Sequence, residues 1–213
     1  MLAITCQIAL LAYHQITTLI DLFPFNGVRN YSGRERLAEL GVNGVLMSLG
    51  PIGFLFESRG LMLYGVVYYF VLLAIEIVIW WIPYFSIPTG LWRRAYNRML
   101  SVATSDFEKG DTLERWLVTY GRLHSETLTL LPLRRGRIVP NMEHIILHGL
   151  TMITAVATLG AYRAASGSDA QGVRITWDGN SKVIVSVPVG SKISWHGVLA
   201  GYPHVYITSS NDD

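Results

Sequence analysis

The run LMLYGVVYYFVLLAIEIVIWWIPYF at residues 61–85 decides the fold class of this chain. Its single acidic or basic side chain is that of Glu76. A helix rises about 1.5 Å per residue, so roughly 20 apolar residues cross a hydrocarbon layer about 30 Å thick. The run lacks the polar stripe that a surface helix of a soluble domain turns toward water. We therefore expect a transmembrane helix that spans at about residues 61–83.

The composition of the whole chain agrees with this membrane class. Of its 213 residues, 51% are hydrophobic and 15% are charged, whereas an average soluble domain is about 25% charged. The formal net charge of +2 is too small to indicate nucleic acid as a partner. Cys6 is the only cysteine, so the chain forms no intramolecular disulfide. We expect its partners to be the lipid bilayer and other membrane protein subunits.

Two further apolar runs precede this span. Residues 1–24 have no basic residue at their start and no small-residue cleavage site, so we expect a retained helix spanning at about 2–23 rather than a signal peptide. Residues 44–56 form a short run with two glycines and a proline. This run is either a kinked crossing over about 41–56 or a re-entrant hairpin. We favour the crossing, because residues 57–60 then form a tight polar turn into the main span.

A fourth span is predicted at about residues 142–162, where small and hydroxyl side chains suit close helix packing. Four crossings make residues 1–162 one membrane domain. Residues 88–140 form its largest polar loop, and their periodicity predicts helices at about 91–106 and 112–131. We expect the second of these helices to pack on the membrane unit or to lie in the headgroup layer.

The C-terminal part of the chain changes its pattern. Residues 163–171 are small and polar and are predicted to form a linker. Apolar residues then alternate with polar ones over residues 172–209, which predicts an antiparallel β-meander of three or four strands. About 40 residues are marginal for independent folding, so this module is expected to dock on the membrane unit or on a partner. The predicted fold class is mainly α and integral to the membrane: a four-helix transmembrane bundle with a cytoplasmic helical loop and a small C-terminal antiparallel β module.

The distribution of basic residues predicts the orientation. Residues 25–43 and 88–140 hold twelve of the 17 Lys and Arg. By the positive-inside rule these two loops lie in the cytoplasm. Both chain termini are then extracytoplasmic, in a plasma or inner membrane.

Ionisable residues inside the predicted spans are the first candidates for a functional site. The helix rise places His14, Glu76 and His148 at similar depths, roughly 8–12 Å from the cytoplasmic ends of their spans. His144 lies one helical turn from His148 on the same face, and Asp21 lies near the same boundary. These five residues form the predicted intramembrane polar cluster.

Several chemistries fit this cluster. His14, Glu76, His144 and His148 could ligate a transition metal ion. Alternatively, His14 and His148 could be the axial ligands of a haem. A proton relay or a quinone pocket is a third option. The fourth is a hydrogen-bonded Glu–His pair that only fixes the helix register.

Basic residues next to the spans have a separate interpretation. Arginines in such positions usually contact anionic lipid and set the topology. The predicted lipid-facing residues are Arg93, Arg94, Arg98, Arg134, Arg135 and Arg137.

The sequence contains no phosphate-binding loop, no serine nucleophile elbow and no CxxC pair, so it identifies no enzyme activity. It favours an accessory, structural or assembly subunit of a larger membrane complex. The alternative is a redox or transport protein that uses the intramembrane His/Glu cluster to bind a metal, haem, quinone or protons.

Overall fold

The computed structural model describes residues 1–124, 126–171, 174–177, 183–186 and 206–207. The chain divides into two compact units, Met1–Gly160 and Ala161–Asp213, and each is described by itself.

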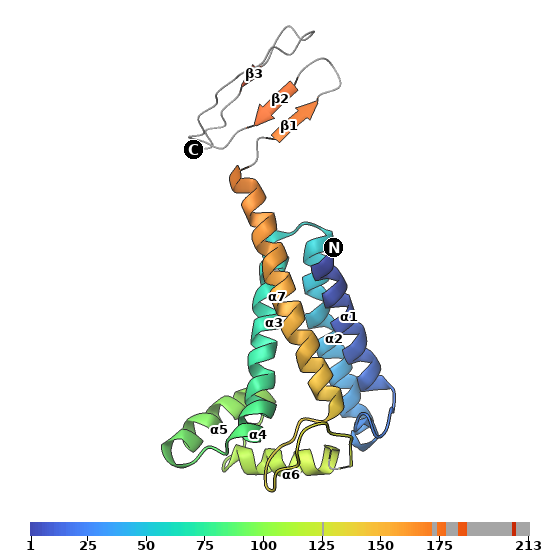
Figure 1. Ribbon diagram of the computed structural model, residues 1–213, viewed down its shortest axis with the longest axis vertical. Helices are drawn as coiled ribbons and strands as arrows, with labels where there is room; N and C mark the ends of the chain where they lie inside the picture. Colours follow the sequence, from blue (N-terminus) through green and yellow to red (C-terminus); the bar gives the residue numbers. More distant parts are fainter. Residues whose placement is uncertain (125, 172–173, 178–182, 187–205, 208–213) are drawn as a thin grey trace. The chain divides into compact units, whose positions relative to one another are not determined.

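Four long helices dominate the described chain, and in the first unit they alternate in direction (Figure 1). Each is long and apolar enough to cross a membrane. The prediction of a mainly α chain with four such helices is therefore confirmed. They are α1 (Leu2–Leu19), α2 (Gly33–Leu55), α3 (Arg59–Glu76) with its continuations η2 (Ile77–Trp81) and α4 (Ile82–Phe85), and α7 (Met142–Gln171).

Helix α2 includes the ambiguous run at residues 44–56 almost entirely, so this run belongs to a helix of crossing length rather than to a hairpin. A reciprocal capping box fixes its start. The hydroxyl of Ser32 accepts from the Glu35 N–H at 3.2 Å, and the Glu35 carboxylate accepts from the Ser32 N–H at 2.7 Å.

Pro51 lies inside α2, where its missing N–H deprives the carbonyl four residues earlier of a helical donor. That carbonyl belongs to Met47, and the hydroxyl of Tyr69 on α3 donates to it at 3.1 Å. Gly50 makes room for this contact, because a Cβ there would lie 3.2 Å from the Tyr69 ring. The glycine and the proline therefore serve the packing of α2 against α3.

The segments that link α3 to α7 lie at one end of the bundle (Figure 1). They contain α5 (Gly90–Thr104) and α6 (Thr112–His124), and the short η1 (Val28–Asn30) lies in the other loop at this end. Helix α6 ends earlier than the predicted residue 131. The reason is that the Leu128 N–H donates to the Pro24 carbonyl at 2.7 Å, and the Leu128 carbonyl accepts from Met142 at 2.8 Å.

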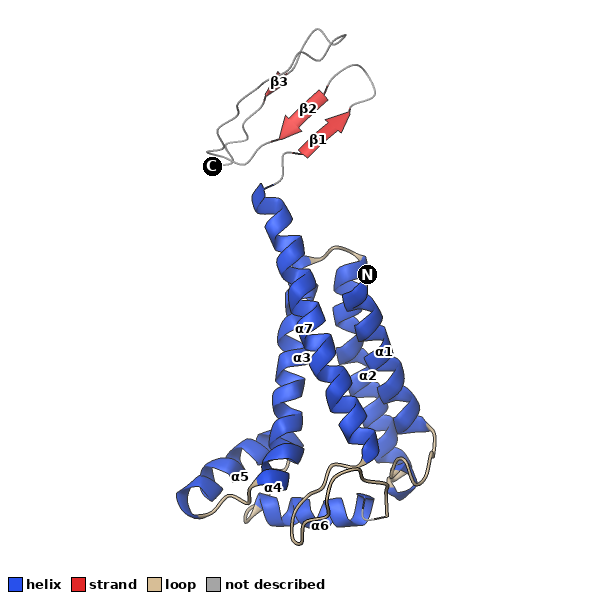
Figure 2. Ribbon diagram, viewed as in Figure 1, coloured by secondary structure: helices blue, strands red, loops and turns tan. Residues whose placement is uncertain are grey.

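In the C-terminal unit, α7 continues as a helix through residues 163–171, where a linker was predicted. Alanine is a strong helix former and is frequent there. The strands are β1 (Arg174–Trp177), β2 (Val183–Ser186) and β3 (Tyr206–Ile207) (Figure 2).

Strand β1 pairs antiparallel with β2, but β2 pairs in parallel with β3. This order differs from the predicted antiparallel meander. The rest of the segment 172–209 lies outside the described residues, so the β module stays a prediction.

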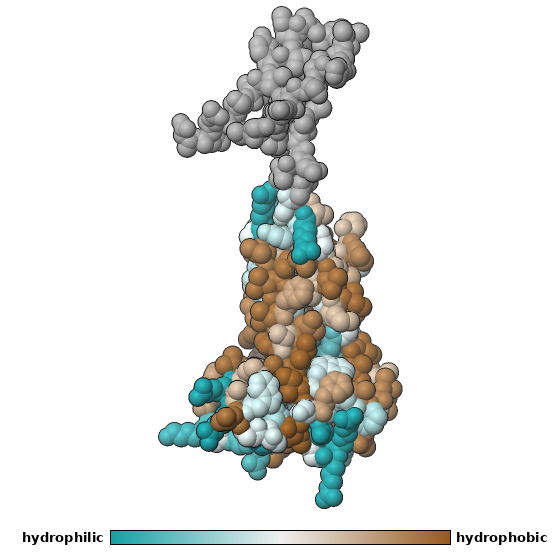
Figure 3. Space-filling model, turned by 60° about the vertical axis from the view of Figure 1, so that its left-hand side comes forward, coloured by the Kyte–Doolittle hydropathy of each residue, from teal (hydrophilic) through white to brown (hydrophobic). Residues whose placement is uncertain are grey.

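Two apolar clusters hold the first unit together. One joins the long helices through Leu10, Met47, Tyr69 and Ala155, and the other joins α5 to α6 through Tyr96, Leu100 and Leu113. On the face seen in Figure 3, the surface of the long helices is largely apolar, with polar side chains toward the ends of the bundle. This is the distribution expected of a protein that faces lipid along its sides.

Candidate functional site

A π-helical turn follows Glu76 on α3 and sets the direction of the next side chains. The turn arises beside Pro83, which has no N–H to give to the carbonyl of Ile79 four residues earlier. The Ile82 N–H bonds to the carbonyl of Ile77, and this leaves the carbonyl of Val78 without its usual donor too. Turns of this kind are frequent at functional sites.

Side chains of α5 and α6 donate hydrogen bonds to both of these carbonyls, those of Val78 and Ile79. The hydroxyl of Tyr96 donates to Val78 at 2.7 Å, and the indole N–H of Trp116 donates to Ile79 at 3.0 Å. Tyr96 is fully buried. The two loop helices therefore fix the conformation of the π turn.

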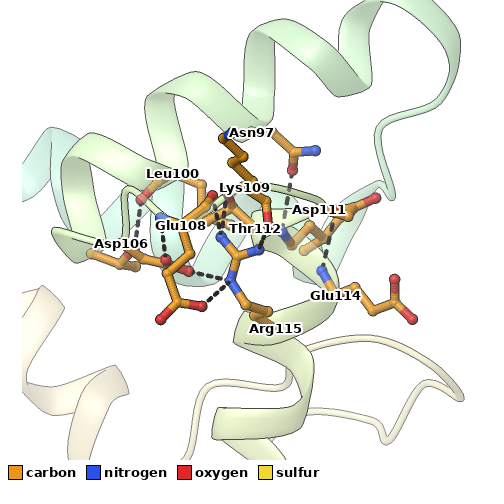
Figure 4. Close-up of polar contacts among 11 residues, drawn as sticks. Asn97, Leu100, Asp106, Glu108, Lys109, Asp111, Thr112, Glu114 and Arg115 are labelled. Carbon is orange, nitrogen blue, oxygen red and sulfur yellow. Dashed lines mark hydrogen bonds and ion pairs between the residues drawn. The ribbon is translucent and has the colours of Figure 1, made fainter.

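A polar network in the loop between α5 and α6 holds these two helices together (Figure 4). The guanidinium of Arg115 donates to Asp106 at 2.7 Å and to the backbone carbonyls of Glu108 and Lys109, both at 3.1 Å. The hydrogen bond from Arg115 holds the pKa of Asp106 below its usual range. The ion pair is therefore expected to persist at neutral pH.

The polar residues of the bundle surround one internal cavity of about 160 Å³. Four of the five residues of the predicted cluster line it: His14 from α1, Glu76 from α3, and His144 and His148 from α7. The remaining wall is mostly apolar and aromatic, and includes Met47, Tyr68, Leu72, Ile75, Ile79, Trp80 and Leu147. A cavity with apolar walls and a few convergent polar groups is the usual form of a small-ligand site.

One atom of each key side chain in this cavity is held by a neighbour. Thr151 donates to Oε1 of Glu76 at 2.8 Å, and the indole N–H of Trp81 donates to Nδ1 of His148 at 3.0 Å. Nε2 of His14 lies 3.3 Å from the amide of Asn43.

The opposite atom of each of these three side chains is buried and has no hydrogen-bond partner among the described residues. These atoms are Nδ1 of His14, Oε2 of Glu76 and Nε2 of His148. Glu76 and His148 are only 5% and 4% exposed. The cavity therefore holds three oriented side chains with free hydrogen-bonding capacity.

A second cavity of about 40 Å³ lies beside the first and shares His14, Glu39, His144 and Leu147 with it. Its other lining residues include Tyr31 and Arg36, which come from the η1 loop and the start of α2. The second cavity is therefore adjacent to the first at the loop-bearing end of the bundle.

His144 also belongs to an aromatic group at this end of the bundle. Its ring lies 3.9 Å from that of Trp80 and 5.0 Å from that of His124, between ring centroids. Burial lowers the pKa of His124 to about 4. Nε2 of His124 lies 3.2 Å from the hydroxyl of Tyr31. This histidine is only 2% exposed, because α6 folds back against the bundle.

Asp21, the fifth residue of the predicted cluster, does not line the cavity. Helix α1 ends at Leu19, and Ile20 has an extended backbone, so Asp21 lies in the following loop. Its carboxylate pairs with Arg29 at 3.0 Å on the surface. Asp21 is therefore a surface loop residue and does not belong to the predicted cluster.

The predicted metal ligands share the cavity without forming a ligand set. Within the part of the chain that the structure describes, no three His, Cys, Asp or Glu side chains form a group that could hold a metal ion.

The predicted lipid-facing arginines divide into two kinds. Arg93 pairs with Asp111 at 2.6 Å. Arg134 and Arg137 both contact Tyr84, the first over its ring and the second at its carbonyl. The others, Arg94, Arg98 and Arg135, have exposed side chains.

Sequence reasoning missed several residues of the site, namely Glu39, Asn43, Trp80, Trp81 and Thr151. A tryptophan pair shortly before a proline was the available signal for the π turn. No local pattern singles out Thr151 or Asn43, since each acquires its role from a neighbouring helix.

The helices and the cavity define the chain as a multi-pass α-helical membrane protein with a polar site inside its bundle. Searches of protein-family models, of curated proteins and of solved structures give no match to this chain.

Proposed function

We propose that this protein is a membrane protein of the transport or redox class that takes up and releases protons at Glu76 and His148. One observation carries the proposal: His14, Glu76 and His148 come from three helices and line one cavity, and each has a buried polar atom with no hydrogen-bond partner among the described residues. An unsatisfied buried polar group costs about 1–3 kcal/mol. A protein that keeps three of them together gains from a species that binds there.

Water and protons suit this cavity. A water molecule occupies roughly 30 Å³ in the liquid, so about five fit into the space. Carboxylates and imidazoles are the side chains that exchange protons inside membrane proteins. A small ligand with hydrogen-bonding groups, such as a quinone head, would be lined by the same three side chains.

The position of the second cavity supports uptake from the loop-bearing end. It shares His14 and His144 with the first cavity and is also lined by Tyr31 and Arg36 from the loop and the start of α2. Leu10, Met47, Tyr69 and Ala155 pack together within the bundle as an apolar cluster. The excess of Lys and Arg in the loops supports a cytoplasmic position for this end, with extracytoplasmic termini.

Infrared difference spectroscopy of the protein in lipid bilayers tests the proposal directly. Between acidic and alkaline buffer, the carbonyl band of a buried protonated carboxyl group should change, and Glu76→Gln should remove this part of the change. Glu114→Gln is the matched control, because Glu114 is exposed on α6. An unchanged carboxyl signal in Glu76→Gln would contradict the proposal. Metal analysis and an absorption spectrum of the same sample test for the metal or haem that the sequence suggested.

An accessory or assembly subunit is the second candidate. It is supported by large apolar side chains that are exposed in the loop before α7: Leu130 is 65% exposed and Leu133 is 81% exposed. Apolar groups gathered on a surface often mark a protein partner. Purification in mild detergent should then yield a second chain, and Leu130→Ser with Leu133→Ser should release it. A chain that purifies as a lone monomer speaks against this candidate.

A further inference from the structure

Helix α5 presents two different apolar faces. The buried face packs on α6 through Tyr96 and Leu100. The second face is exposed and carries Trp92, Met99 and Val102, which follow helical spacing. An amphipathic helix with an exposed apolar stripe and basic residues is typical of the membrane interface.

A groove of about 440 Å³ runs between this second face and α3. One wall consists of Val71, Ala74 and Ile75 on α3 and Val78 on η2, which lie on one face of a continuous helix able to cross a membrane. Its α5 wall consists of Arg98, Met99, Val102 and Ala103. The groove extends roughly 10 Å along α3, given the rise of a helix.

The charge in this groove is as informative as its apolar walls. Arg98 is the only charged residue that lines it, and its side chain is exposed. Arg93 on the same helix is already neutralised by Asp111. This apolar groove along a membrane helix carries one exposed guanidinium. It therefore matches a molecule with an alkyl chain and an anionic head.

We propose that the α3–α5 groove binds an anionic phospholipid, with an acyl chain between the two helices and the phosphate at Arg98. Guanidinium groups bind phosphate through paired, charge-assisted hydrogen bonds. The acyl chain covers the apolar side chains that α3 and α5 expose to each other. This site is separate from the polar cavity, although Ile75 lines both.

Native mass spectrometry of the full-length protein tests this proposal. Delipidated protein is titrated with dioleoyl phosphatidylglycerol and, in parallel, with dioleoyl phosphatidylcholine. The wild type should retain the anionic lipid preferentially. Arg98→Gln should weaken its binding about tenfold, as expected when a charge-assisted hydrogen bond to the head group is lost.

Arg94→Gln is the matched control, because Arg94 is exposed on the same helix but does not line the groove. It should leave binding unchanged. Ala74→Phe fills the groove from an exposed position and should weaken the binding of both lipids. The proposal fails if Arg98→Gln and Arg94→Gln have equal effects, or if Ala74→Phe leaves the binding of both lipids unchanged.

Discussion

Replacement of Tyr69 by Phe isolates one hydrogen bond on which the packing of α2 depends. The hydroxyl of Tyr69 is the donor to the carbonyl of Met47, which Pro51 leaves without a helical partner. Tyr69 and Met47 are 0% and 1% exposed, so water cannot replace the donor. Phe keeps the ring and creates no large cavity. The loss should therefore equal the cost of an unsatisfied buried carbonyl, about 1–3 kcal/mol.

Tyr64→Phe provides a closely matched comparison. Tyr64 also lies on α3, and its hydroxyl donates at 3.0 Å to the carbonyl of Leu46, the residue next to Met47. That carbonyl already has a helical donor four residues on, the N–H of Gly50. Loss of the Tyr64 hydroxyl should therefore change the free energy of unfolding only slightly.

The assay is thermal unfolding in detergent, followed by circular dichroism of the helices. For a chain of this size each kcal/mol shifts the midpoint by roughly 2–4 °C, so Tyr69→Phe should lower it by roughly 2–12 °C. A midpoint for Tyr69→Phe that equals that of Tyr64→Phe would refute the argument about the proline and its orphaned carbonyl.

Three further predictions concern other parts of the bundle. Gly53→Ala should destabilise the turn from α2 to α3, because its Cβ would lie 2.6 Å from the backbone carbon of Leu61. Gly41 lies in α2 as well, and a Cβ added there meets nothing within 4 Å, so Gly41→Ala should raise the stability of the protein by up to about 1 kcal/mol. Equal unfolding midpoints for the two variants would contradict the steric argument. The pKa of His124 is about 4 in the folded chain because the side chain is buried, against 6.5 for the exposed group. Since the unfolded chain binds this proton first, stability should fall as the pH falls from 6.5 to 4, by roughly 3 kcal/mol. His124→Gln should reduce the dependence of the unfolding midpoint on pH over this range, and an unchanged slope would show that other groups carry the effect. Ser32→Ala removes the N-cap of α2 and should cost about 0.5–2 kcal/mol in chemical unfolding; no loss would mean that the helix start is held by other contacts.

Part of the site could be read from the chain before its fold was known. The positions of His14, Glu76 and His148 along their spans indicated a common depth, and the structure brings all three to one cavity. Depth follows from the helix rise alone. Direction around the helix axis does not, and for this reason Thr151 was missed. Asp21 was wrongly included because α1 ends at Leu19, before the predicted end of the span.

The sequence by itself determined the number of helices able to cross a membrane and their approximate places in the chain. The thickness of a hydrocarbon layer sets a minimum apolar length, which is a local property of the chain. Only the tertiary structure decided how these helices face one another. The rotation of α2 against α3 depends on close contacts at Gly50 and Gly53, and the π turn after Glu76 depends on donors from α5 and α6. Such contacts join residues far apart in the chain, and no local pattern encodes them.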